Sequence, residues 1–205
     1  DVMVRRMARC SVVPRKGQHV LARALARLRD EAWTCICAGS LERDPEYAEE
    51  VLRLVRAAGL EDRVSFPGEC GERELDRLYH RSSVFVLPSY YEGYGMALAE
   101  ALARGLPIVA TTGGAIPFTA PADAALLVAP GDDERLALGI LPFIVNRRYT
   151  IKHGKQNQAP DPLHGGATST AEDRTAAARR HAATLPDWPD AAASFADAVL
   201  ELGGG

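Results

Sequence analysis

The sequence predicts an α/β fold: a doubly wound, parallel, six-stranded Rossmann-like sheet with helices on both faces. Short apolar runs alternate with segments of helical periodicity through residues 8–138. Runs such as 84–87 (Val-Phe-Val-Leu) are apolar at every position, which is typical of strands that are buried on both faces. Of the 205 residues, 47% are hydrophobic and 25% are charged, a balance that allows a single domain to bury a real core.

The predicted strands are six short apolar runs, at residues 8–13, 33–38, 64–66, 84–87, 107–110 and 126–128. The segments between them carry apolar residues at helical spacing, as Leu21, Leu25 and Leu28 do in the first. Asp44 and Pro45 are a typical start for the second helix, because Asp caps a helix and Pro is tolerated at its first position. Repeated strand–helix units of this kind predict parallel strands that are joined by crossover helices.

The pattern changes after residue 138. Residues 139–170 mix Pro, Gly, Asn and Gln without a period, a composition that does not sustain a packed element. Helical spacing returns near Ala171, and Phe195, Val199 and Leu202 lie on one predicted helical face. We therefore expect one domain at 1–138, an irregular insertion or disordered segment at 139–170, and a C-terminal helical tail at 171–205.

Charge and cysteine content exclude several classes of partner. The chain has 24 Lys+Arg against 27 Asp+Glu, a formal net charge of -3, which excludes a strongly basic nucleic-acid binder and a polybasic membrane-surface module. The longest apolar run, 137–145, is too short to cross a bilayer, so no transmembrane segment is expected. Cys10, Cys35, Cys37 and Cys70 lack the paired spacing of a zinc site and indicate a reducing, cytoplasmic location without a bound metal.

Two loops are predicted to form an anion-binding site. With the usual strand order, ligands of a doubly wound sheet bind between the carboxyl ends of the first and fourth strands. The loop after the first strand carries Arg15 and Lys16, and the loop after the fourth, residues 88–95, opens a helix. Gly93 and Gly95 would let the backbone approach a ligand, and N–H groups at a helix start bind anions. This geometry favours phosphate binding, with solvated cations beside an ordinary glycine turn as the alternative.

Glu100 is expected to be a second ligand-binding residue. Its helix is otherwise almost entirely apolar, so we expect the carboxylate to be buried and to have hydroxyl or N–H partners. Helical side chains lean toward the N-terminus, which directs Glu100 toward the predicted anion site. The hydroxyls of a sugar or a ribose would satisfy both of its oxygens. The alternative is a structural carboxylate that caps neighbouring backbone groups.

Glu92 and Glu100 stand in Glu-Gly-Tyr-Gly-Met-Ala-Leu-Ala-Glu, which matches an E-x7-E motif. With the flanking segments 87–89, 105–107 and 113–114 and with Arg-Lys-Gly after the first strand, the sequence resembles the C-terminal, donor-binding half of a GT-B glycosyltransferase of family 4 (group 1). The resemblance covers residues 8–138. It implies the retaining transfer of a hexosyl group from a nucleoside diphosphate sugar to an unknown acceptor, without a metal or other cofactor.

The resemblance also implies a role for each matching residue. Glu92 would be the catalytic residue that binds hydroxyls of the transferred sugar. Lys16, helped by Arg15, would hold the diphosphate together with backbone N–H groups of the glycine-rich loop. Glu100 would bind the ribose, and the backbone near Cys70 would contact the base. The implied donor-binding residues are Arg15, Lys16, Gly39, Cys70, Gly93, Tyr94, Gly95, Met96 and Glu100.

The chain departs from the family pattern in three respects. Ser11 stands where many members carry an Arg, and Phe118 stands where a Glu is common. The N-terminal half, which would supply the acceptor contacts and any membrane attachment, is missing. Besides the UDP- or GDP-linked sugar, that half is therefore the expected partner.

Two other functions compete with an active transferase. One is a non-catalytic nucleotide-sugar-binding module, or an inactive fragment that lacks the acceptor domain. The other is a dinucleotide-dependent oxidoreductase of the same fold, which the sequence disfavours because residues 14–17 read Pro-Arg-Lys-Gly instead of G-x-G-x-x-G.

Overall fold

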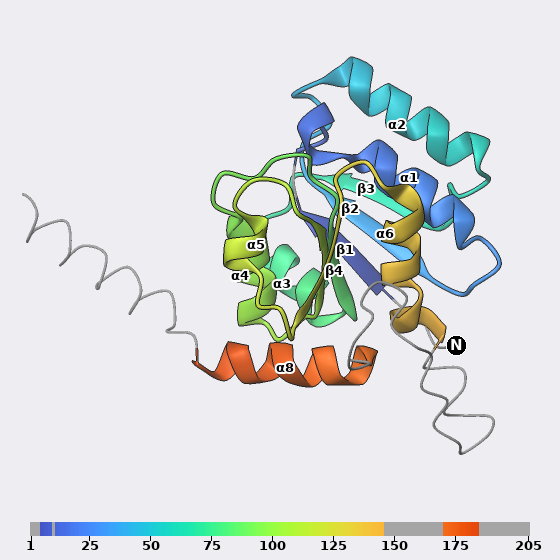
Figure 1. The fold of residues 1–205 in the computed structure, drawn as a ribbon. Helices are drawn as coiled ribbons and strands as arrows, with labels where there is room; N and C mark the ends of the chain where they lie inside the picture. Colours follow the sequence, from blue (N-terminus) through green and yellow to red (C-terminus); the bar gives the residue numbers. More distant parts are fainter. Residues whose placement is uncertain (1–4, 10, 146–169, 185–205) are drawn as a thin grey trace, which may run out of the picture.

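The structure, a computed structural model, describes residues 5–9, 11–145 and 170–184, and its centre is a parallel sheet (Figure 1). Six strands lie in the order β3-β2-β1-β4-β5-β6, and every adjacent pair is parallel. The strands are β1 (Arg5–Arg9), β2 (Thr34–Ala38), β3 (Val64–Gly68), β4 (Val84–Leu87), β5 (Ile108–Thr111) and β6 (Ala125–Val128). The predicted α/β class with a parallel sheet is confirmed, and β1 and β4 are neighbours, as the site prediction requires.

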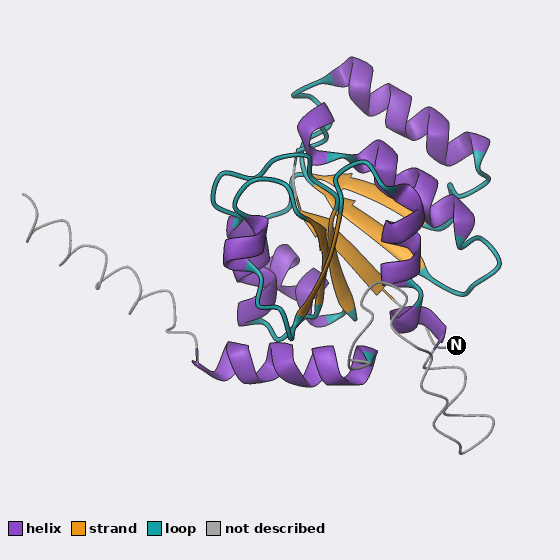
Figure 2. Cartoon of the chain, in the orientation of Figure 1, coloured by secondary structure: helices purple, strands orange, loops and turns teal. Residues whose placement is uncertain are grey.

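Helices cover both faces of this sheet (Figure 2). One face carries α1 (Gln18–Arg27), α2 (Pro45–Ala57) and α6 (Asp133–Ile140). The other carries α3 (Glu72–His80), α4 (Met96–Ala103) and the short α5 (Ile116–Thr119). Each face has its own apolar core; Leu25 and Leu136 lie in one, and Leu87 and Leu98 in the other. Because helices cover both faces, the central strands β4 and β5 are buried at every position, which explains their apolar sequences without alternation.

The first strand begins and ends earlier than predicted. The prediction was 8–13, whereas β1 spans Arg5–Arg9 and pairs with β2 from Arg5↔Thr34 to Arg9↔Ala38. Beyond the strands, the Val12 N–H still donates to the Ser40 carbonyl at 2.9 Å. The prediction was wrong because it followed the apolar side chains, whereas the register of β2 decides which backbone groups pair.

Helical structure continues beyond residue 138, where the regular pattern was predicted to end. Helix α6 continues to Ile140, and residues 142–145 form a further helical turn. The large apolar side chains buried along this stretch have the helical spacing i, i+4, i+7 and i+8: Leu136, Ile140, Phe143 and Ile144. Gly139 and Pro142 obscured that pattern in the sequence. The rest of the predicted irregular segment, 146–169, lies outside the described residues.

The predicted C-terminal tail begins as a helix. Helix α8 (Ala171–Thr184) packs against α4 and runs below the amino ends of the strands in Figure 1. The predicted face of Phe195, Val199 and Leu202 lies outside the described residues. None of the helices that the structure describes combines the length and the apolarity needed to span a membrane. The loops at the carboxyl ends of the strands gather at the opposite edge, where the candidate site lies.

Candidate functional site

The two loops that were predicted to be neighbours are in direct contact. The first contains the 3-10 turn η1 (Pro14–Lys16), and the Tyr90 N–H of the second donates to the Arg15 carbonyl at 2.8 Å. Gly17 has φ +68°, and a Cβ there would lie closer than 3.0 Å to the Pro88 carbonyl oxygen, a distance that real Cβ atoms do not reach. A glycine is therefore required at this position for two reasons, its backbone conformation and the approach of the β4 loop.

Lys16 and Glu92, which lie 76 residues apart in sequence, form an ion pair between these loops. Only 11% of the Lys16 side chain and 9% of the Glu92 side chain are exposed. Ser89 Oγ also donates to Glu92 Oε1, at 2.8 Å. Burial lowers the effective dielectric around the pair and strengthens its attraction. The structure thus brings together the cation and the carboxylate that the sequence had placed on separate loops, and both are groups that bind polar ligands.

A third loop, after β5, holds Glu92 in place. The Ala115 N–H donates to the Glu92 carbonyl at 2.8 Å, and Gly114 forms an isolated parallel bridge with Glu92. A Cβ on Gly114 would lie closer than 3.0 Å to backbone atoms of Glu92, and one on Gly113 would lie 2.8 Å from the Ser89 carbonyl oxygen. The pair of glycines therefore lets the β4 and β5 loops touch backbone to backbone.

Helix α4 starts beside this contact. Gly95 is its N-cap, with φ +80° and without a side-chain cap, and the Gly95 carbonyl accepts from the N–H groups of Leu98 and Ala99. The first N–H groups of a helix have no acceptor within the helix, so those of Met96 and Ala97 are able to donate to a ligand. Tyr94 and Met96 are 73% and 58% exposed. The predicted helix start is therefore present at the same edge as Lys16.

Glu100 differs from its prediction in burial. It is half-buried, because α4 turns the side of Met96 and Ala103 to the surface. It does have a hydroxyl partner, since Tyr79 Oη donates to Glu100 Oε2 at 3.1 Å. The Arg104 guanidinium lies over the Tyr79 ring, 4.6 Å from its centroid, and donates to the Glu100 carbonyl at 3.1 Å. This partner belongs to the protein itself, as the structural alternative requires.

The remaining predicted residues lie around this centre. Arg15 and Gly93 are exposed. Gly39 follows β2, and its N–H donates to the Gly68 carbonyl at 2.8 Å at the end of β3. Cys70 is half-buried in the loop before α3; burial, followed by the nearby Glu74 carboxylate, raises the pKa of its thiol. These residues share the carboxyl edge of the sheet with the ion pair.

A polar cluster that was not predicted from the sequence lies beside the ion pair. His19 Nδ1 lies 2.7 Å from Tyr47 Oη, and His19 Nε2 lies 3.2 Å from Tyr90 Oη. Tyr47 lies on α2. It is 7% exposed, and burial, as the largest cause, raises the pKa of its phenol to about 12. The one signal in the sequence was a histidine two residues after Gly17, at the start of the first helix.

The chain matches the family model described as Glycosyl transferases group 1 over residues 2–146. It is 31% identical over 144 residues to the lipopolysaccharide core biosynthesis mannosyltransferase LpcC of Rhizobium leguminosarum bv. viciae, a match that covers 68% of this chain and 40% of that protein. The chain therefore spans less than half the length of this relative.

Two solved structures share the fold. The C-terminal domain of a glycosyl transferase group 1 family protein (LpcC) from Francisella tularensis has a TM-score of 0.64 at 20% identity, with 88% of this chain and 85% of that chain covered. Anabaena HepE in complex with UDP-glucose has a TM-score of 0.60 at 25% identity, with 87% and 44% covered. Because the family model matches most of the chain and the fold agrees with both structures, the chain belongs to the group 1 glycosyl transferases.

Proposed function

We propose that this chain is the donor-binding domain of a retaining glycosyltransferase that takes a hexosyl group from a nucleoside diphosphate sugar. One observation carries the proposal: Lys16, from the turn after β1, meets Glu92, from the loop after β4, beside the uncapped start of α4. That junction offers a cation, a carboxylate and free helix N–H groups within one small region, which are the groups that a sugar diphosphate requires. A structure of a similar chain, HepE, was solved with UDP-glucose, which supports a nucleotide sugar as the ligand.

In this proposal the diphosphate competes with Glu92 for the Lys16 ammonium. The charge on the phosphates is then balanced by Lys16, by the exposed Arg15 and by the N-terminus of α4, without a metal ion. Once Lys16 has turned to the phosphates, the Glu92 carboxylate is available to hydroxyls of the transferred sugar. The backbone around Gly93 and Gly95 donates to the phosphate oxygens.

The nucleoside would extend from the junction along the carboxyl edge of the sheet. The Glu100 carboxylate would accept hydrogen bonds from the ribose hydroxyls, either beside the bond from the Tyr79 hydroxyl or in place of it. Gly39 and the backbone near Cys70, at the ends of β2 and β3, would contact the base. These are the loops that border β1 on the side away from β4, which leaves the β5 loop for the sugar.

The complete transferase requires a second half. Because the chain covers 40% of the mannosyltransferase that it resembles, we infer that a preceding N-terminal domain supplies the acceptor contacts and any membrane attachment. The donor domain proper comprises the residues through 145, and α8 is an appended helix that docks on α4. A cytoplasmic location fits the reduced thiols of Cys35, Cys37 and Cys70.

The test is a titration of the chain with UDP and with GDP, followed by thermal shift and calorimetry. We expect one of the two to stabilise the protein, and Lys16→Ala to weaken its binding by about 1.5–3 kcal/mol, because a charge-assisted contact is lost. Arg53→Ala, which removes one exposed positive charge from α2, is the control for net charge and should leave the affinity unchanged. Binding of neither nucleotide, or equal affinities for Lys16→Ala and wild type at low salt, would remove the proposed site.

Two further measurements separate the alternatives. Release of free sugar from a nucleoside diphosphate sugar by this chain indicates a transferase centre, whereas nucleotide binding without release supports a binding module. For the ribose role, wild type should bind the ribonucleotide more tightly than its 2′-deoxy analogue, and Glu100→Ala should lose that discrimination. If the discrimination persists, Glu100 is the structural carboxylate of the alternative.

A further inference from the structure

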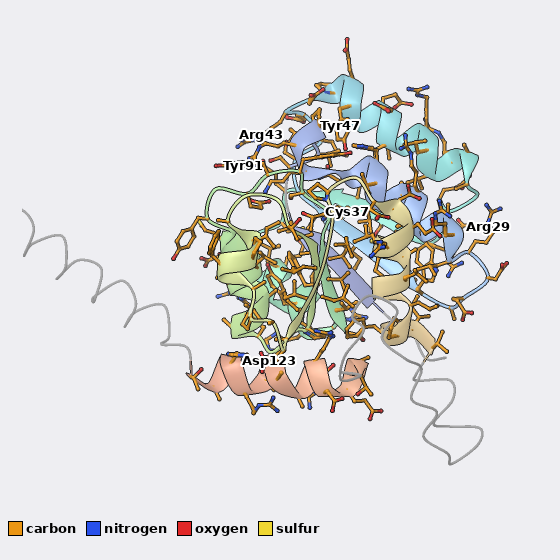
Figure 3. All side chains as sticks on the ribbon, viewed as in Figure 1. Arg29, Cys37, Arg43, Tyr47, Tyr91 and Asp123 are labelled. Carbon is orange, nitrogen blue, oxygen red and sulfur yellow. The ribbon has the colours of Figure 1, made fainter. Side chains whose placement is uncertain are left out.

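His19 connects three elements around the candidate site. It is the second residue of α1, three positions after Lys16. Its ring nitrogens reach Tyr47 Oη on α2 and Tyr90 Oη on the β4 loop, at 2.7 and 3.2 Å. The His19 ring also stacks on the Tyr90 ring, with centroids 5.8 Å apart and planes inclined by 16°. Tyr47 marks this contact between α1 and α2 in Figure 3.

The hydrogen bonds of Tyr47 assign the tautomer of His19. The Tyr47 hydroxyl accepts from the backbone N–H of His19 at 3.2 Å, so its single proton is free to be donated to Nδ1. Nδ1 is then the acceptor, and the proton of the neutral ring lies on Nε2, which donates to Tyr90 Oη. A second proton on the ring would turn Nδ1 into a donor that faces the Tyr47 hydroxyl, which already accepts from the His19 backbone N–H. The bond between Nδ1 and Tyr47 would therefore be weakened.

We propose that neutral His19 is a positioning residue that holds the β4 loop, through Tyr90, in the geometry in which Glu92 meets Lys16. Tyr90 is linked to the first loop twice, by its ring to His19 and by its own N–H to the Arg15 carbonyl, at 2.8 Å. Glu92 follows two residues later. Loss of the His19 link leaves the backbone bond from Tyr90 and the Lys16–Glu92 ion pair to hold the two loops together. The effect on nucleotide binding rests on the proposed function; the effect on the loop does not.

The charges around His19 set the direction of its pH dependence. Arg23 on α1 and Glu50 on α2 are the charged groups that act on it, and the two tyrosines are the other titratable groups in contact. Burial, and then Arg23, lower the pKa of His19 below its ordinary value of 6.5, and Glu50 opposes them. The neutral ring is therefore favoured in the folded protein. As the pH falls below 6.5 through the lowered pKa, the second proton enters at Nδ1 and weakens the bond with Tyr47 that orients the ring. The Nε2–H group still donates to Tyr90, but from a ring that is held less firmly, so the link is weakened.

Amide hydrogen exchange of the peptide that contains residues 88–95 tests the link without any ligand. Tyr90→Phe keeps the ring stack and removes the acceptor hydroxyl. His19→Asn places an amide near Nδ1 and does not reach Tyr90, whereas His19→Gln places one near Nε2 and does. We expect exchange about 3- to 10-fold faster, after correction for intrinsic rates, in Tyr90→Phe and His19→Asn, the effect of one lost hydrogen bond. His19→Gln should restore most of the protection.

The pH profile separates positioning from a purely structural role. Wild-type protection of the 88–95 peptide should fall in a step below pH 6.5, and His19→Gln, which does not titrate there, should lack that step. His80→Asn on α3 removes another histidine and should keep the wild-type profile. Unchanged exchange in both Tyr90→Phe and His19→Asn, or an acid step that persists in His19→Gln, overturns the proposal.

Nucleotide titration of the same variants gives the second readout. If wild type binds UDP or GDP, Tyr90→Phe and His19→Asn should bind it about 3- to 10-fold more weakly. Faster exchange with unchanged affinity would mean that the link holds the loop and has no part in binding, which overturns the role at the site. If wild type binds neither nucleotide, the proposed function fails, and the exchange experiment still decides whether His19 positions the loop.

Discussion

The substitution Gly17→Ala tests the contact between the two loops, and Gly59→Ala is its matched control. The two glycines have nearly the same backbone conformation, φ +68° and φ +66°. Alanine in this left-handed region costs about 1–2 kcal/mol at either position. A Cβ on Gly59 would meet nothing within 4 Å, whereas one on Gly17 would overlap the Pro88 carbonyl group, whose carbon would lie 3.1 Å away.

The overlap adds a second cost at Gly17 only. Forcing an extra methyl group into packed surroundings typically costs about 1–3 kcal/mol, because the backbone has to move. We therefore expect the free energy of unfolding to fall by about 1–2 kcal/mol in Gly59→Ala and by about 2–5 kcal/mol in Gly17→Ala. Since Lys16 is the adjacent residue, the same displacement should separate it from Glu92 and weaken nucleotide binding in Gly17→Ala alone.

Urea denaturation followed by circular dichroism measures both free energies, provided that the slope with urea is unchanged between variants. Calorimetric titration with the nucleotide that wild type binds gives the second readout. Equal destabilisation by the two substitutions would refute the reasoning, because it would show that the β4 loop moves away from the added methyl group without a loss of unfolding free energy. Normal binding by a destabilised Gly17→Ala would show that the close approach matters to the fold and not to the site.

Two other predictions concern parts of the fold away from the site. Arg63 lies over the Trp33 ring, 3.9 Å from its centroid, and donates to the carbonyls of Arg29 and Trp33. Because lysine lacks the planar guanidinium that makes these contacts, Arg63→Lys should lower the free energy of unfolding by about 1–3 kcal/mol. An unchanged urea midpoint would contradict this prediction. The hydrogen bond from His181 on α8 is the largest cause that lowers the pKa of Asp123 below 3.8. The stabilisation of the folded state by this bond is present above pH 3.8 and is lost as the pH falls through the lowered pKa. Limited acid proteolysis should therefore release α8 more readily below pH 3.8 in wild type, whereas Asp123→Asn should show the same susceptibility on both sides of that pH.

Local sequence patterns were sufficient for most elements of the sheet. The run 84–87 is the strand β4, Val84–Leu87, and all four of its residues are buried. Asp44 caps α2 as predicted, because its carboxylate accepts from the Tyr47 N–H at 3.1 Å. These features depend on residues within a few positions of one another, and periodicity and capping describe such short-range order well.

The contact between the two loops of the candidate site was also predictable, because it follows from topology. The strand order of this doubly wound sheet reverses between β1 and β4, which are therefore neighbours. The loops that follow their carboxyl ends have to meet for this reason. The extent of β1 was not predictable in the same way, since β2 selects which residues of the first segment pair. Nor was the packing of Phe143 and Ile144, which depends on a core formed by distant elements.

By itself, then, the sequence determined the fold class, the family pattern and the edge of the sheet at which the two candidate loops meet. Only the tertiary structure decided which polar groups pair there: Lys16 with Glu92, Tyr79 with Glu100, and His19 with two tyrosines. The phenols of Tyr79 and Tyr47 belong to side chains that periodicity assigns to an apolar face, and their hydroxyls lie at the far tip. A hydrogen bond requires that donor and acceptor atoms lie within about 3.2 Å of each other. The paired residues are 21 to 76 positions apart in sequence, so the packing of whole elements sets the distance between their polar atoms. Short-range sequence patterns do not record that packing.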